Sequence, residues 1–177
     1  WQDSSTAPSF VVSGPGEYKV SLELGGCTTS DSTRVREVEY PTFSLGNDVT
    51  LCADSTLLLD VTTDTASYQW LDGSTNPTFL VSGPGIVWAD VSYEQCTTRD
   101  SINIAYFDPI LLELGEDTTI CEETSLNIAG NVPGATFTWS DGSTNAFLTV
   151  DLAGDYSVEA ILNGCPAYDT ISVALQE

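Results

Sequence analysis

The five cysteines of this 177-residue chain are the residues with the clearest chemistry, because two thiols can be oxidised to a disulfide. Cys52 and Cys96 are 44 positions apart, and so are Cys121 and Cys165. We therefore predict one disulfide within each pair, with Cys27 unpaired in this segment. Buried free thiols are the alternative, while a metal site is disfavoured because the chain has no Cys-x-x-Cys spacing and no histidine. Disulfides indicate an oxidising compartment, so we expect an extracellular or cell-surface protein.

The cysteine spacing is part of a 69-residue repeat that runs through the chain. A tryptophan recurs at positions 1, 70 and 139, and a cysteine recurs at 27, 96 and 165. The front half of the unit, which carries Cys52 or Cys121, occurs only twice. We therefore predict the C-terminal part of an incomplete repeat at residues 1–40 and complete repeats at 41–109 and 110–177. Because the chain opens on a central tryptophan strand, we expect a fragment of a longer array, or a first domain completed by another chain.

Apolar and polar residues alternate with a period of two, which predicts β-strands. In Ser67–Trp70 and Thr136–Trp139 the two aromatic side chains of each strand share one face. The Asp-Gly that soon follows each of these strands predicts a tight turn. Six or seven short strands per unit favour an all-β fold, with tandem β-sandwich domains of about 69 residues arranged end to end. Trp70 and Trp139 are expected in the cores of these domains.

The chain is strongly acidic, with 26 aspartates and glutamates, 4 lysines and arginines, and a formal net charge of −22. Such a surface repels nucleic acids and anionic membranes, so we expect neither as a partner. No apolar run is long enough to cross a bilayer, which argues against membrane insertion. The absence of histidine and of a Gly-x-Ser-x-Gly motif leaves no activated nucleophile, so we do not expect an enzyme.

Five aspartates near the ends of the predicted units are candidate calcium ligands, because calcium prefers carboxylate oxygens. They lie at the start of each complete unit, near its last strand, or in the connection between units: Asp48, Asp117, Asp100, Asp169 and Asp108. Gathered around a cation, they would stiffen a joint. The alternative is solvated surface charge or acids that cap turns, and no loop matches a dedicated calcium motif. Apart from this calcium candidate, we expect no cofactor.

Trp88 and Tyr93 are aromatic residues that the other repeats lack at the equivalent positions. Val87 occupies the core-facing position of its strand, so alternation points the neighbouring Trp88 outwards. An outward Trp88, with Tyr93 nearby, is a candidate contact for a sugar or a neighbouring subunit. Ordinary strand packing is the alternative.

Several motifs of the repeat resemble the immunoglobulin-like and PKD-like repeats of large cell-surface adhesins of Bacteroidota-type bacteria, associated with gliding motility or type IX secretion. The matching stretches are Leu114–Cys121, Thr138–Ser143, Ala153–Val158, Asn163–Cys165 and Asp169–Val173. The resemblance covers essentially the whole chain. It implies export and a place outside the cell, and it supplies no catalytic residues.

Together these observations favour a non-catalytic structural or adhesive segment, such as a stalk or appendage shaft, of a large exported cell-surface protein. Such a segment would mediate attachment to surfaces or to other cells. Its expected partners are other repeats of the same protein, further copies of the chain in a fibre or homo-oligomer, and an unidentified surface ligand. Two alternatives remain: a carbohydrate- or protein-binding module built around Trp88, and a spacer beside an enzyme domain.

Overall fold

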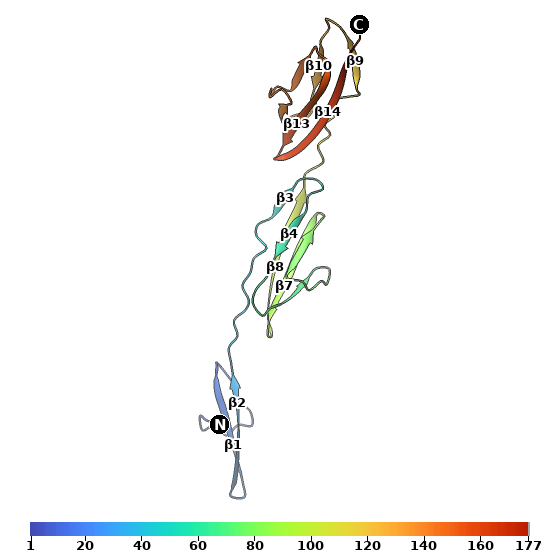
Figure 1. Ribbon diagram of the computed structural model, residues 1–177. Coiled ribbons are helices and arrows are strands. Elements are labelled where there is room, and N and C mark those ends of the chain that lie inside the picture. Colours follow the sequence, from blue (N-terminus) through green and yellow to red (C-terminus); the bar gives the residue numbers. More distant parts are fainter. Residues whose placement is uncertain (177) are drawn as a thin grey trace. The chain divides into compact units, whose positions relative to one another are not determined.

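The computed structural model describes residues 1–176, which form fourteen β-strands and no helix (Figure 1). Residues 1–176 accordingly contain no helix with the length and apolarity needed to cross a membrane. In chain order the strands are β1 (Gly16–Leu24), β2 (Cys27–Val35), β3 (Val49–Leu51), β4 (Leu57–Asp60), β5 (Ser67–Trp70), β6 (Thr78–Val81), β7 (Gly85–Tyr93), β8 (Cys96–Tyr106), β9 (Thr118–Cys121), β10 (Leu126–Ala129), β11 (Thr136–Trp139), β12 (Phe147–Val150), β13 (Gly154–Leu162) and β14 (Cys165–Gln176).

The last repeat is a sandwich of two sheets. One sheet has four strands in the order β11-β13-β14-β9, and the other pairs β10 with β12. β13 and β14 form an antiparallel hairpin that closes at Leu162 and Cys165. β9, the first strand of the repeat, runs parallel to β14, the last, from the pair Thr118–Val173 to the pair Cys121–Gln176. The two ends of the repeat are therefore joined by a strand pairing.

The core of the last repeat lies where the inward residues of these alternating strands meet. Trp139 of β11 is 2% exposed, and its indole N–H donates to the carbonyl oxygen of Asn145 at 2.9 Å. A buried tryptophan leaves a costly unpaired donor unless its N–H finds an acceptor, and the turn after β11 supplies one. The buried cluster around it contains Leu112, Ile128, Val132, Phe137, Leu148, Val150, Val158, Ala160, Ile171 and Val173.

The middle repeat has the same strand pattern. Its sheets are β3-β8-β7-β5 and β4-β6, and β3 again runs parallel to the last strand, with Leu51 paired to Tyr106. Trp70 is fully buried and stacks on Phe79 with ring centroids 5.0 Å apart. Its N–H donates to the carbonyl oxygen of Asn76 at 2.8 Å. The expected core positions of Trp70 and Trp139 are confirmed, as is an all-β fold with six strands in each complete repeat.

The first repeat is represented by the antiparallel hairpin β1-β2. The ring of Trp1 lies 5.4 Å from that of Phe10, and Phe10 lies 5.7 Å from Tyr18, centroid to centroid. The N–H of the Trp1 ring donates to the carbonyl oxygen of Ala7 at 2.8 Å. The tryptophan and its acceptor six positions later thus recur in all three repeats.

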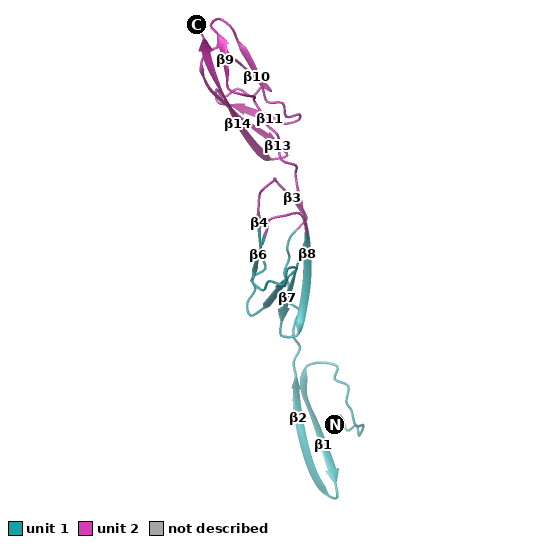
Figure 2. Cartoon of the chain, turned by 90° about the vertical axis from the view of Figure 1, so that its right-hand side faces the viewer, with its two compact units in different colours: residues 1–46, 58–80, 86–102 teal, residues 47–57, 81–85, 103–177 magenta. Residues whose placement is uncertain are grey.

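The chain folds as two compact units, coloured separately in Figure 2. Unit 1 comprises Trp1–Gly46, Leu58–Leu80 and Ile86–Ile102, and unit 2 comprises Asn47–Leu57, Val81–Gly85 and the chain from Asn103 onwards. This division cuts through the middle repeat and does not follow the repeat period. The boundaries 1–40, 41–109 and 110–177 stay a prediction about sequence units.

Candidate functional site at the cysteines

The two cysteine positions of the repeat lie at different places in the strand pattern. We call Cys52 and Cys121 the front cysteines, and Cys27, Cys96 and Cys165 the rear cysteines. A front cysteine lies at the end of the first strand of its repeat, directly after β3 or as the last residue of β9. A rear cysteine opens the last strand of its repeat, directly after the turn of the final hairpin.

Cys52 forms a disulfide with Cys165, with the two Cα atoms 5.5 Å apart and a sequence separation of 113. Both residues belong to unit 2. The bond joins the front cysteine of the middle repeat to the rear cysteine of the following repeat. The predicted pairs Cys52–Cys96 and Cys121–Cys165 are therefore wrong.

The last repeat shows why a bond within one repeat cannot form. Cys165 is the first residue of β14, whereas Cys121 is paired with Gln176, the last residue of the same strand. A strand rises about 3.3 Å per residue, which places the two cysteines about 36 Å apart. A disulfide requires Cα atoms within about 7 Å. The front and rear cysteines of one repeat thus lie at opposite ends of its four-stranded sheet.

The middle repeat repeats this arrangement along β8. Cys96 is its first residue, and Leu51, the residue before Cys52, is paired with Tyr106 at its other end. The rise of ten residues separates these ends by about 33 Å. The 44-residue spacing seen in the sequence therefore reflects a repeated position in each sandwich and not a contact.

Three cysteines are free within the described chain: Cys27 and Cys121 are exposed, and Cys96 is half-buried. The thiol of Cys96 donates to the carbonyl oxygen of Val38 at 3.6 Å. Next to it, the guanidinium of Arg36 lies 3.4 Å from a carboxylate oxygen of Glu94, in the turn before Cys96. Cys96 thus lies against the connection that leads into its own repeat.

Asp100 and Asp169, two of the candidate calcium ligands, accept hydrogen bonds from backbone N–H groups. Oδ2 of Asp169 accepts from the N–H of Leu114 at 2.6 Å, and Oδ1 accepts from Thr170 at 2.8 Å. Asp100 makes the same two bonds one repeat earlier, with Leu45 and the residue after itself. Each aspartate fastens the segment that leads into a repeat onto that repeat's last strand. The pKa of Asp100 lies below its ordinary value of 3.8. The hydrogen bond from the N–H of Leu45 is the largest cause, and the bond from the N–H of Ser101 is the next largest.

The remaining candidate ligands do not gather with them. Oδ1 of Asp48 accepts from the N–H of Asn103 at 2.8 Å, and Asp117 makes the equivalent bond with Ser172 at 2.9 Å. Asp108 is exposed. Across residues 1–176 no group of three or more histidine, cysteine or acidic side chains is placed to hold a metal ion. The four regularly spaced aspartates thus accept equivalent backbone hydrogen bonds in the two complete repeats.

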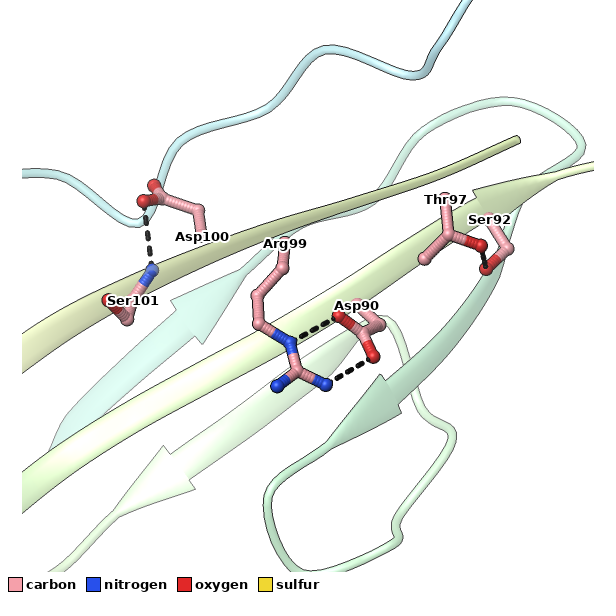
Figure 3. A network of polar contacts seen from close by, with 6 residues as sticks. All are labelled: Asp90, Ser92, Thr97, Arg99, Asp100 and Ser101. Atoms are coloured by element: carbon pink, nitrogen blue, oxygen red, sulfur yellow. Dashed lines mark hydrogen bonds and ion pairs between the residues drawn. The ribbon is translucent and has the colours of Figure 1, made fainter.

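Trp88 lies on the outer face of β7, between the core residues Val87 and Ala89, and it is half-buried. The guanidinium carbon of Arg99 lies 3.8 Å from the centroid of its ring, in a cation–π contact. Arg99 also binds Asp90 through both carboxylate oxygens at 2.7 Å, as Figure 3 shows. This ion pair lowers the pKa of Asp90. The sequence reading of Trp88 overlooked Arg99, the only basic residue after Arg36.

Tyr93, the second candidate contact residue, ends β7 and is exposed. Tyr93 lies five positions after Trp88, so the two aromatic side chains project from opposite faces of the strand by alternation. They do not form a shared aromatic platform. The ring of Trp88 has Arg99 over one face, which leaves less of it open to a planar ligand than the sequence suggested.

No protein-family model matches this chain, and no curated protein matches it by sequence. Solved structures do match. The N-terminal eight Ig domains of Down Syndrome Cell Adhesion Molecule (isoform 1.30.30) match at a TM-score of 0.50 and 15% identity, over 91% of this chain and 27% of that one. Extracellular domains 3–5 of Drosophila OTK match at 0.44 and 13%, over 92% and 72%. The I-band fragment I67–I69 of titin matches at 0.42 and 11%, over 92% and 75%.

At such low identity the comparison concerns the fold alone. The match at a TM-score of 0.50 is to a chain of immunoglobulin domains in series. It agrees with the paired sheets, the buried tryptophan and the hairpin of each complete repeat described above. The chain consists of immunoglobulin-like β-sandwich domains in tandem.

Proposed function

We propose that this chain is a segment that carries tension in the shaft of a large exported protein that attaches cells to surfaces or to one another. The observation that carries the proposal is the disulfide between Cys52 and Cys165, which connects two consecutive repeats covalently. Such a bond stabilises the folded chain and also cross-links one domain to the next. A protein that must resist pulling or proteolysis gains from it.

Other features support an extracellular role. A disulfide persists in an oxidising compartment. The net charge of −22 keeps a long exported protein soluble and disfavours nucleic acid as a partner. The resemblance of the repeat to those of bacterial surface adhesins supports the same place, with type IX secretion as the export route. Further repeats of the same protein, or copies of it in a fibre, are the partners such a shaft would contact.

A binding module built around Trp88 is the competing function. The contact between Arg99 and the Trp88 ring weighs against it, because that contact already occupies one face of the ring. The spacer hypothesis differs from the shaft only in what lies beside the segment, and the disulfide between repeats favours the shaft.

Single-molecule force spectroscopy tests the proposal. The chain is held at its two ends and stretched with and without dithiothreitol. In the oxidised chain the loop between Cys52 and Cys165, with a separation of 113, stays closed when both repeats unfold. Reduction should lengthen the fully stretched chain by about 370–410 Å, since an extended residue spans at most about 3.3–3.6 Å.

Equal lengths with and without reductant would show that the disulfide carries no tension, and they would contradict the proposed function as a shaft. The binding alternative has a separate readout. A panel of glycans that quenches tryptophan fluorescence in the wild-type chain, but not in Trp88→Ala, would favour a binding module. The expected result for a shaft is no quenching with either protein.

A further inference from the structure

The free thiols occupy the same positions in the repeat as the two cysteines that are bonded. Cys121 is one repeat after Cys52, and Cys96 is one repeat before Cys165. Each free thiol is therefore equivalent to one half of the observed disulfide. We infer that the bond is a property of every joint: each front cysteine pairs with the rear cysteine of the following repeat, at a separation of 113.

The contact that Cys96 makes supports this assignment. The thiol of Cys96 contacts the carbonyl oxygen of Val38. In the next repeat the position equivalent to Val38 is Phe107. The N–H of Phe107 donates to the carbonyl oxygen of Leu51, the residue before Cys52, at 2.9 Å. The residue that the Cys96 thiol contacts is therefore equivalent to Phe107, which binds the residue just before a front cysteine. Cys96 lies where it would meet the front cysteine of the repeat before it.

The space around Cys96 suits such a partner. An open hollow of about 580 Å³ is lined by Arg36, Val38, Glu94, Gln95 and Cys96. All five residues belong to unit 1, so the hollow lies within one compact part of the molecule. The thiol of Cys96 is half-buried at its edge, open to a second thiol but not to bulk solvent on all sides. The partner assigned to it is the front cysteine of another repeat in the same array.

Formation of each bond is a two-electron oxidation. Two thiols lose two protons and two electrons and form one S–S bond. A small disulfide such as oxidised glutathione, or a disulfide oxidoreductase, accepts both and leaves as two thiols. Thiol–disulfide exchange also replaces a wrongly paired bond by the native one, so the pairing reached at equilibrium reports the folded geometry. The inference concerns which cysteines of successive repeats bond to one another, and it does not rest on the proposed role as a shaft.

The test lengthens the array by one repeat. A further copy of residues 41–109 is inserted between residues 109 and 110, so that the whole original chain is kept. The protein is folded in a glutathione redox buffer, and its disulfides are mapped by mass spectrometry of unreduced peptides. The expected result is two disulfides where the original chain has one. Cys52 bonds to the inserted Cys96, and the inserted Cys52 bonds to Cys165, both at a separation of 113.

The number of free thiols stays at three, and Cys165 changes its partner from the original Cys52 to the inserted one. A Cys52→Ser variant of the lengthened chain is the control, and it should keep only the bond to Cys165. A bond between Cys52 and Cys96 of one copy, retention of the original Cys52–Cys165 pair across the inserted repeat, or covalent multimers would each overturn the inference.

The original chain gives a second readout that needs no insertion. Alkylation of the oxidised protein under native conditions should label Cys27, Cys96 and Cys121 and spare Cys52 and Cys165. Recovery of Cys96 or Cys121 in a bond to a cysteine of its own repeat would also overturn the inference, whether or not the lengthened chain folds.

Discussion

Removal of the disulfide between repeats should cost more stability than any other single change at the cysteines. The bond closes a loop with a sequence separation of 113. In the chain-entropy description, closing this loop lowers the entropy of the unfolded chain by about 16 cal/mol/K. That stabilises the folded state by about 4.8 kcal/mol at 25 °C. Cys52→Ser and Cys165→Ser should each lower the free energy of unfolding by up to this amount. Guanidinium titration followed by tryptophan fluorescence measures the loss.

The losses of stability in Cys52→Ser and Cys165→Ser should not add. Both variants remove the same bond, so the double variant should be no less stable than the worse single variant. Cys121→Ser is the matched control, because that thiol is exposed and unbonded, and its unfolding midpoint should not move. Losses that sum in the double variant, or a loss below about 1 kcal/mol in Cys52→Ser, would refute the reasoning from loop closure.

Three further outcomes can be checked by thermal or chemical unfolding. Asp169→Ala should cost about 1–3 kcal/mol, because two backbone N–H groups lose a charged acceptor; an unchanged midpoint would contradict the fastening role. The pKa of Asp100 is lowered in the fold, so its ionised form stabilises the fold above pH 4. This stabilisation is lost as the pH falls through the folded pKa. Asp100→Asn should therefore lose less Tm on acidification than the wild type does. Gly130→Ala should cost about 1–3 kcal/mol, because its Cβ would lie 2.6 Å from Cε1 of Phe137, while Gly83→Ala, which meets nothing within 4 Å, should be neutral.

The repeat could be read from the sequence, and much of the fold followed from it. Strands Ser67–Trp70 and Thr136–Trp139 were predictable because their aromatic residues alternate, and the buried Trp139 follows from the same pattern. The pairing of β9 with β14 could not be read in this way. A pairing between the first and last strands of a unit depends on how the sandwich closes, which the local residue pattern does not encode.

The error in the disulfides has the same physical origin. A fixed spacing of 44 between Cys52 and Cys96 identifies equivalent positions, but it contains no information about distance. Once Cys121 is known to lie beside Gln176, the bond within one repeat is excluded and the bond to the next repeat becomes the available one. The repeated aspartates were likewise visible in the sequence, while their partners, the N–H groups of Leu45 and Leu114, depend on tertiary contacts.

The parallel pairing of β9 with β14 has a mechanical consequence. Once the Cys52–Cys165 bond is reduced, tension acts on the last repeat at Thr118 and at Gln176, and it pulls two neighbouring strands in opposite directions along their length. The hydrogen bonds between them are then loaded in shear and must break together, whereas a hairpin pulled apart at its open end unzips one bond at a time. An immunoglobulin-like repeat built in this way resists stretching most strongly at the strand through which the chain enters it.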